Sequence, residues 1–405
     1  MKSLTFTLIK YIYYIFLFLI LTGSNIYLGP ITAKYVLGLI LFLLVLIHDN
    51  GIVMDKCFRI YCIFIVFFFL SSLACGYLSN FIVTFLNYYF IAYVGWRATN
   101  IMIQRNVDSA KYIIYLILGI GLFDVIVTLS QMTFNVAWYT PIESFFQFKV
   151  DEDIEEYAQY KTYLTIPLTG VFGNAVKNGW YLAVCSVLST IFIFKYKKVV
   201  LYVLPLFFLI GTFACQERSA LAAAIIMLGV ISLRLFNNFS FAKKVLLTIA
   251  IIAGVIYLGN YLINFSQVNG LRYTELGLDD TGRSDILEGF FSYLASNPIL
   301  PNYYELIDHG GRPPHNILFN AFVYGGIASF IAIVSVLIIQ AKSCVKIYFS
   351  PVFKDNYVVL ITICAFAVFT INSFFHNQSI VTGELMPWLL WSIIYRINQN
   401  NNIKI

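Results

Sequence analysis

Charge, cysteine and histidine are all scarce in this chain of 405 residues. Only 11% of the residues are charged, whereas 60% are hydrophobic and 18% are aromatic; an average soluble domain has about 25% charged residues. This composition excludes a water-soluble globular protein. The 26 basic residues stand in small groups between long apolar runs, and they form no basic stripe of the kind that binds nucleic acid. We therefore expect no nucleic-acid partner.

Metal and nucleotide sites are not indicated either. The seven cysteines form no CxxC pair and mostly lie in apolar runs, so we expect them to be reduced packing residues. The four histidines are scattered and give no zinc spacing. The acidic residues around Asp279 and Asp280 lack the spacing of a calcium loop, and the phosphate-binding glycine motifs are absent. We predict no metal and no cofactor.

Long apolar runs dominate the sequence instead. A membrane-spanning helix needs about 20 mostly apolar residues, and strand-like alternation of period two is absent. Twelve apolar runs lie at 6–24, 30–47, 59–78, 81–96, 112–131, 178–194, 199–215, 219–235, 245–263, 316–340, 357–375 and 379–395. We predict an all-α polytopic membrane protein with about 12 transmembrane helices, organised as a single transmembrane domain over residues 1–405.

The positions of lysine and arginine predict the orientation, because cytoplasmic segments of membrane proteins are enriched in both. With the N-terminus inside, seventeen of the 26 basic residues fall in inner segments, and two more, Lys10 and Lys34, lie near run ends. The outer segments hold only Lys149, Lys161, Lys177, Arg218, Arg272, Arg283 and Arg312. Both termini are therefore expected in the cytoplasm. The two long links, a first outer loop at 132–177 and a larger outer loop at 264–315, are expected to face outward.

The larger outer loop contains the most informative stretch. Apolar residues at helical spacing predict a short amphipathic helix at the membrane interface over 283–294. His309, Arg312 and His315 follow it close to the predicted membrane surface. Guanidinium groups suit a phosphate head group there, because they bind two phosphate oxygens through parallel hydrogen bonds.

Structural explanations stay open for each of these polar residues. Glu217 could simply neutralise Arg218, and for Arg283 a solvated ion pair with neighbouring acids is the more ordinary explanation. His315 at the start of a helix could be a cap or a packing residue. Asp124 lies within an apolar run, and we favour a structural role for it over a role in substrate binding.

The order of several short motifs resembles the O-antigen polymerase and ligase superfamily. The motifs are Gly173-Asn174 with Asn178, Arg218-Ser219-Ala220, Gly282-Arg283, Asn297-Pro298, His315-Asn316 and Gly325-Gly326. Together they cover about residues 170–335. The chain departs from the family pattern in having no tryptophan soon after Gly282 and in continuing Asn297-Pro298 with Ile-Leu-Pro.

The resemblance implies a metal-independent membrane glycosyltransferase. In the polymerase branch, the growing glycan passes from undecaprenyl diphosphate to a lipid-linked repeat unit at the periplasmic face of the bacterial inner membrane, and a flippase and a chain-length regulator are possible partners. The ligase branch transfers the glycan to a lipid A core. Arg218 and Arg283 would hold the diphosphate and His315 would be the catalytic base. Second-rank candidates are Arg272, His309, Arg312 and Asn178.

A transporter is the alternative from another class. A flippase for lipid-linked oligosaccharides can also have about twelve helices, but it would show internal two-fold similarity and polar residues along a central path. This chain shows no internal repeat and concentrates its ionisable residues at one face. We therefore favour the enzyme, with polymerase ahead of ligase.

Reporter fusions test the predicted topology. Fusions at Glu155 and Asp308 should report an outer location, and fusions at Lys197, Lys244 and Lys346 an inner one, because basic residues concentrate in the inner segments. A cytoplasmic reporter at Asp308 would contradict the outer placement of the candidate site.

Overall fold

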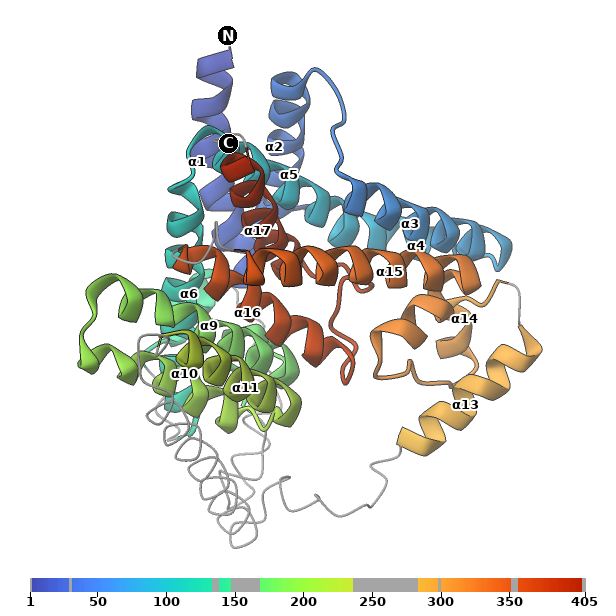
Figure 1. The fold of residues 1–405 in the computed structure, drawn as a ribbon. Coiled ribbons are helices and arrows are strands. Elements are labelled where there is room, and N and C mark those ends of the chain that lie inside the picture. The colour runs from blue at the N-terminus through green and yellow to red at the C-terminus, as the bar shows by residue number, and fades with distance from the viewer. Residues whose placement is uncertain are drawn as a thin grey trace, which may run out of the picture.

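The computed structural model describes residues 2–28, 31–132, 138–146, 168–235, 283–297, 300–350 and 356–402. These residues are mostly helical (Figure 1). The helices are α1 (Lys2–Leu21), α2 (Ala33–Asp49), α3 (Lys56–Ala74), α4 (Leu78–Thr84), α5 (Phe90–Arg105), α6 (Ser109–Met132), α7 (Thr140–Phe146), α9 (Ala175–Tyr196), α10 (Val203–Ala214), α11 (Arg218–Leu235), α13 (Arg283–Ser296), α14 (Tyr303–Asp308), α15 (Ile317–Phe349), α16 (Tyr357–Ser373) and α17 (Met386–Asn402). The short elements are antiparallel strands β1 (Tyr27–Leu28) and β2 (Ile31–Thr32), the π-helical turn η1 (Phe85–Tyr89), and the 3-10 turns η2 (Gly170–Phe172) and η3 (Val199–Tyr202).

Among the described residues, six helical stretches are long and apolar enough to cross a membrane, as expected of a polytopic membrane protein. They are Leu4–Leu21, Lys56–Ala74, Leu78–Arg105, Ser109–Gln131, Ala175–Tyr196 and Ile317–Phe349. Every predicted apolar run except 245–263 corresponds to a helix, and that run lies outside the described residues. Several of these helices are shorter than a full span, among them Arg218–Leu233 and Tyr357–Ser373. The number of 12 spans therefore stays a prediction.

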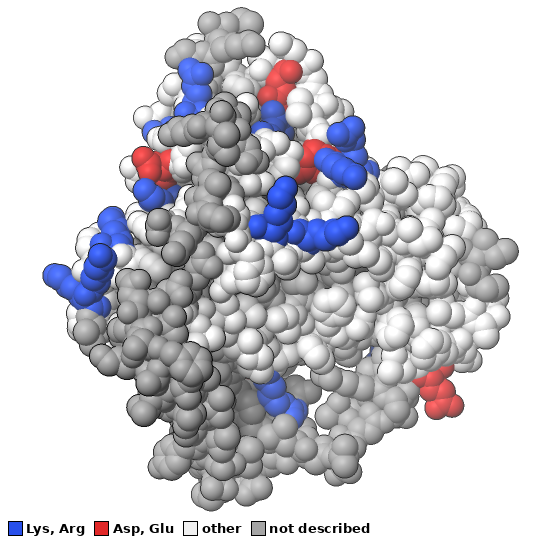
Figure 2. Space-filling view, viewed as in Figure 1, with Lys and Arg blue, Asp and Glu red and all other residues white. Residues whose placement is uncertain are grey.

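The helical assembly has two distinct ends. Both termini lie at one end, which we name the terminal end (Figure 1); there the Arg105 guanidinium lies 5.7 Å from the centre of the Phe6 ring. The links that follow α3 and α16 lie away from the termini in Figure 1, and we name the part of the molecule that holds the links after α1, α3, α10 and α16 the distal end. Lys and Arg side chains gather over the terminal end in Figure 2, as a cytoplasmic location of this end would require. The compartment itself stays a prediction.

The fourth predicted run ended at residue 96, whereas the helical stretch in the structure continues through Arg97 to Arg105. A buried ion pair accounts for this continuation. The Arg97 Nε and Nη2 atoms lie 2.5 and 2.8 Å from the two carboxylate oxygens of Asp49. Both side chains are almost fully buried, at 6% and 5% exposure. Because this carboxylate compensates the charge within the protein, Arg97 does not end the helix, although the sequence pattern alone suggested that it would.

The last predicted run, 379–395, becomes helical only at the start of α17. The residues before it form a turn that two buried tyrosines hold in place. Tyr61 donates to the Ile380 carbonyl (2.6 Å), and Tyr89 donates to the Val381 carbonyl (2.7 Å). These bonds satisfy turn carbonyls that a helix would otherwise pair, so the apolar character of the turn reflects burial and not helix formation.

Helix α13 confirms the amphipathic helix predicted in the larger outer loop. Its Phe290 is buried, and the centre of its ring lies 5.4 Å from that of Phe319 of α15. Leu306 of α14 packs in the same cluster. The apolar face predicted to lie on the membrane interface therefore packs on protein. The remainder of this loop before 283 lies outside the described residues, as does 147–167 of the first outer loop.

The buried ion pair predicts the effect of removing one partner. Asp49→Ala leaves the Arg97 charge buried without its carboxylate and should lower the free energy of unfolding by about 3–5 kcal/mol. Asp49→Ala/Arg97→Leu should recover part of this loss, because an apolar replacement of a buried pair is often close to neutral. Thermal unfolding of the detergent-solubilised protein measures both effects. Unchanged stability of the single variant would contradict this account.

Candidate functional site

Three segments far apart in the sequence meet at the distal end: the start of α11, the start of α15 and the turn after α16. The chain reverses between α10 and α11 through Gln216, whose φ is 57°. Glu217 comes next, and its carboxylate lies 2.9 Å from Nε2 of His376 in the turn after α16. Ser219 donates a hydrogen bond to Oδ1 of Asn372 (2.7 Å). Arg218, the first residue of α11, stands between these two anchored residues.

The start of α15 adds a second histidine. Asn316 caps the helix by accepting the Leu318 N–H (2.8 Å), and its amide nitrogen donates to the Phe374 carbonyl (3.1 Å). His315 directly precedes this cap, and its ring centre lies 6.4 Å from that of His376. The cap thus brings the two imidazoles to the same region.

Two buried amides at this meeting point each have one polar atom without a partner among the described residues. Asn320 donates to Asn377 (3.3 Å), but its Oδ1 has no hydrogen bond; Asn372 accepts from Ser219, but its Nδ2 has none. Both side chains are at most 1% exposed. Buried polar atoms are rarely left unpaired, so each of these two atoms can take a further hydrogen-bond partner. We name the group the Arg218 site: Glu217, Arg218, His315, Asn320, Asn372 and His376.

The segments that carry two of the predicted site residues, Arg218 and His315, therefore meet. Arg283 begins α13, and its side chain is not among those that the structure describes. Arg272 lies outside the described residues altogether. A joint role of the two arginines in holding a diphosphate stays a prediction.

His309 and Arg312 are exposed in the segment after α14. The His309 ring lies 2.7 Å from the Glu305 carbonyl. At the end of α14, Asp308 accepts a hydrogen bond from Tyr77 (2.6 Å), and this bond to a carboxylate raises the pKa of Tyr77 to about 12. These contacts attach the segment to the link between α3 and α4, and none of those described here joins it to the Arg218 site.

Asn178, the other second-rank candidate, lies inside the protein with Asp124. The carboxylate of Asp124 accepts the Val171 N–H (3.0 Å). We assign the Asn178 amide with its nitrogen toward this carboxylate, because its oxygen then accepts from the Gly170 N–H (3.0 Å) and from Thr128 Oγ1 (2.9 Å). The network ties η2 to α6 and α9. It supports a structural role for both residues.

Glu217 and His376 are the site residues that sequence reasoning missed. The sequence suggested Glu217 only as a partner for Arg218, whereas in the structure the Glu217 carboxylate lies 2.9 Å from Nε2 of His376. One signal was present: His376-Asn377 repeats the dipeptide His315-Asn316. One copy stands at the start of α15 and the other in the turn after α16, and these two segments meet at the Arg218 site.

No group of three or more His, Cys, Asp or Glu side chains in the described ranges could hold a metal ion. Asp279 and Asp280, the acids considered for a metal, lie outside those ranges. A metal-free site therefore stays a prediction.

The Asp124 network predicts that Gly170 cannot carry a side chain. An added Cβ would lie 2.2 Å from Asp124 Oδ1, and the backbone there has φ +56°. Gly170→Ala should lower the free energy of unfolding by more than the roughly 1–3 kcal/mol that a strained backbone costs by itself. Gly229→Ala on α11, where an added Cβ would meet nothing within 4 Å, is the matched control. Thermal unfolding in detergent compares the two variants, and equal stability would refute this reading of the network.

No family model, curated protein or solved structure matches this chain.

Proposed function

We propose that the chain is an O-antigen or surface-polysaccharide polymerase. It transfers a growing glycan from undecaprenyl diphosphate to a lipid-linked repeat unit at the outer face of the bacterial inner membrane. The motif resemblance suggests the reaction. The observation that supports it most is the meeting of the segments that carry Arg218, His315 and His376, beside buried amide atoms that have no partner among the described residues.

Arg218 is suited to the leaving group. As the anomeric carbon–oxygen bond to the diphosphate breaks, the departing diphosphate gains negative charge. A guanidinium group can hold two phosphate oxygens at once, and a positive group fixed in advance lowers the barrier by stabilising this charge. Arg218 is half-buried at the N-terminus of α11, where the helix dipole also favours an anion. Its neighbours Glu217 and Ser219 are both anchored to the α16 segment.

His376 is suited to the proton. The acceptor hydroxyl oxygen bonds to the anomeric carbon and must lose its proton, which an imidazole can take. The Glu217 carboxylate at 2.9 Å would stabilise the resulting imidazolium, as a buried carboxylate does beside histidine in hydrolytic triads. We therefore propose His376 as the base, positioned by Glu217. His315, the base that the resemblance implies, would then contact the acceptor sugar.

Substitution of Arg218 separates charge from geometry. Arg218→Ala should lower turnover by about 10²–10³, the usual effect of losing one preorganised donor. Arg218→Lys should be nearly as damaging, because lysine keeps the charge but loses the paired donors. Arg59→Lys, an exposed arginine at the start of α3, is the control. The assay follows the polymer ladder made by purified protein from a lipid-linked repeat unit, at matched protein amount. Full activity of Arg218→Lys would argue against diphosphate binding.

The same assay compares the two histidines and the two acceptors. His376→Ala should abolish transfer and Glu217→Gln should lower it, while donor binding persists, because a base contacts the acceptor and not the leaving group. If only His315→Ala abolishes transfer, His315 is the base. A capped lipid A core without a ladder would identify a ligase. Movement of the intact lipid-linked unit across the membrane without bond formation would identify a flippase.

A further inference from the structure

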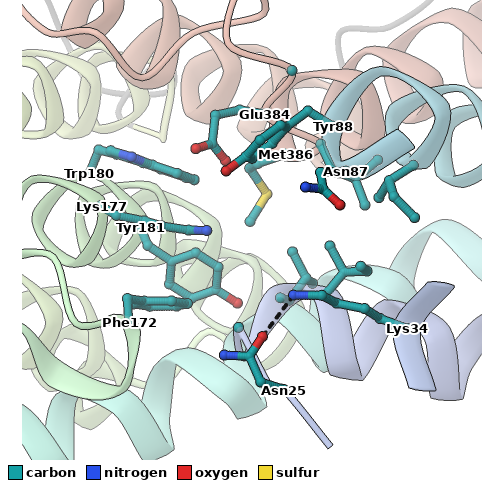
Figure 3. A pocket seen from close by; sticks show the side chains of 16 residues that line it. Asn25, Lys34, Asn87, Tyr88, Phe172, Lys177, Trp180, Tyr181, Glu384 and Met386 are labelled. Atoms are coloured by element: carbon teal, nitrogen blue, oxygen red, sulfur yellow. Dashed lines mark hydrogen bonds between the residues drawn. The ribbon is translucent and has the colours of Figure 1, made fainter. Parts of the chain in front are cut away.

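A polar pocket of about 160 Å³ opens at the distal end. Its lining comes from the link after α1, from α2, from η1, from η2 with α9, and from the turn before α17. Figure 3 shows Asn87, Lys34 and Lys177 with their polar ends toward one central space. Segments that are distant in the sequence thus build one cavity.

The π-helical turn η1 supplies part of this lining. It interrupts the helical stretch Leu78–Arg105, and Asn87 and Tyr88 both belong to it and both line the pocket. Gly383, which has φ +76°, packs against this turn so closely that an added Cβ would lie 2.4 Å from the Tyr88 Cβ. Single π-helical turns within α-helices occur often at functional sites. The turn therefore indicates that this pocket binds a ligand.

Aromatic rings form much of the wall. Trp180 and Tyr181 of α9 and Phe172 of η2 line the pocket together with Tyr88. The centre of the Tyr181 ring lies 5.0 Å from that of Phe172 and 5.9 Å from that of Trp180, and the Tyr181 hydroxyl donates to the Ile117 carbonyl (3.1 Å). The three rings on this side are therefore held in place. Flat apolar surfaces of this kind suit the C–H face of a sugar ring.

Hydrogen-bonding groups complete the lining. Asn25 and Asn87 offer amide donors and acceptors, and Glu384 offers a carboxylate acceptor. The indole Nε1 of Trp180 is buried and has no hydrogen-bond partner among the described residues. A hydroxyl group both donates and accepts, so it can bind to an amide, a carboxylate, an indole N–H or an ammonium group alike. The pocket therefore suits a ligand with several hydroxyls, whatever the net charge of its lining.

The pocket adjoins a wider hollow. This second cavity, of about 520 Å³, shares Asn25, Lys34, Asn87 and Tyr88 with the pocket and extends to β1 and β2. A ligand longer than one ring could therefore place one unit in the pocket and the next unit in the hollow.

The first turns of α9 separate the pocket from the Arg218 site. Lys177 and Trp180 line the pocket, whereas Gly179 faces Glu217 so closely that an added Cβ would lie 2.4 Å from the Glu217 Cγ. A helix with its side chains is about 10 Å across. The pocket is therefore suited to a sugar unit other than the one that would react at the Arg218 site.

We infer that the pocket between Lys34, Asn87 and Glu384 binds one sugar unit in its ring form. The aromatic walls contact the C–H face of the ring, and the amides and the carboxylate bind its hydroxyls. A longer glycan continues into the wider hollow. The identification of this sugar as part of the glycan substrate rests on the proposed polymerase function; the binding of a sugar in the pocket does not.

Ligand binding to the purified full chain tests the inference without any turnover. Dissociation constants of glucose, galactose, mannose, rhamnose, N-acetylglucosamine and N-acetylgalactosamine are measured by saturation-transfer NMR, in a detergent without a sugar head group. Mannitol is the control ligand, because it has the hydroxyls of a sugar but no ring. We expect at least one sugar to bind about threefold or more tightly than mannitol, the usual effect of one aromatic contact. A smaller ratio for all six sugars would overturn the inference.

Substitutions in η1 locate the site. Tyr88→Ala should weaken binding of that sugar about threefold or more, and Tyr88→Phe should retain it, because the ring forms the wall. Alanine keeps the Cβ that packs on Gly383. Asn87→Ala should weaken binding by a similar factor, about that of one hydrogen bond. Tyr112→Ala is the matched control, since Tyr112 is 57% exposed, against 49% for Tyr88, and does not line either cavity. Binding that responds to neither Tyr88→Ala nor Asn87→Ala would lie elsewhere and refute this site.

The outcome is separable from that of the proposed function. A chain that binds a sugar in this pocket but makes no polymer contradicts the polymerase proposal and leaves the pocket assignment intact. A chain that makes polymer but binds no sugar in the pocket contradicts the pocket assignment alone.

Discussion

Asp124 places a carboxyl group in the interior of the helical assembly, and the bonds that satisfy it hold three elements of the distal end together. The Val171 N–H and the Asn178 amide both donate to this group, which joins α6 to η2 and to the start of α9. A buried polar group that loses its hydrogen bonds costs about 1–3 kcal/mol, so these elements cannot separate without that cost. Because the first turn of α9 also carries Gly179, which packs closely against Glu217, the same bonds hold the α9 side of the Arg218 site.

Much of the helical architecture could be predicted because it depends on local properties. The length of an apolar run and the helical spacing around Phe290 are visible in the sequence, and α9, α11 and α13 begin within a few residues of their predicted starts. The continuation of the helix past Arg97 could not be predicted, because the partner of Arg97, Asp49, belongs to another helix. The late start of α17 likewise depends on Tyr61 and on the rest of the remote core.

Of the candidate site, only the residues that stand in the short sequence motifs could be predicted. Arg218 and His315 stand in motifs, whereas the contact of Glu217 with His376 arises from the packing of α11 against α16. Sequence patterns report the environment of each residue along one element; they do not report which elements meet.

The break within α15 separates a segment long enough to span a bilayer from a short segment that carries residues of the Arg218 site. At Gly326 the backbone has φ 71° and ψ −160°, far from helical values. The residues after the break, 327–349, extend about 34 Å at 1.5 Å per residue, which already exceeds the roughly 30 Å thickness of a bilayer core. The two turns before the break follow His315 and carry Asn320. A thicker or thinner bilayer can therefore be accommodated by tilting the long segment, while the short segment keeps its register with α16.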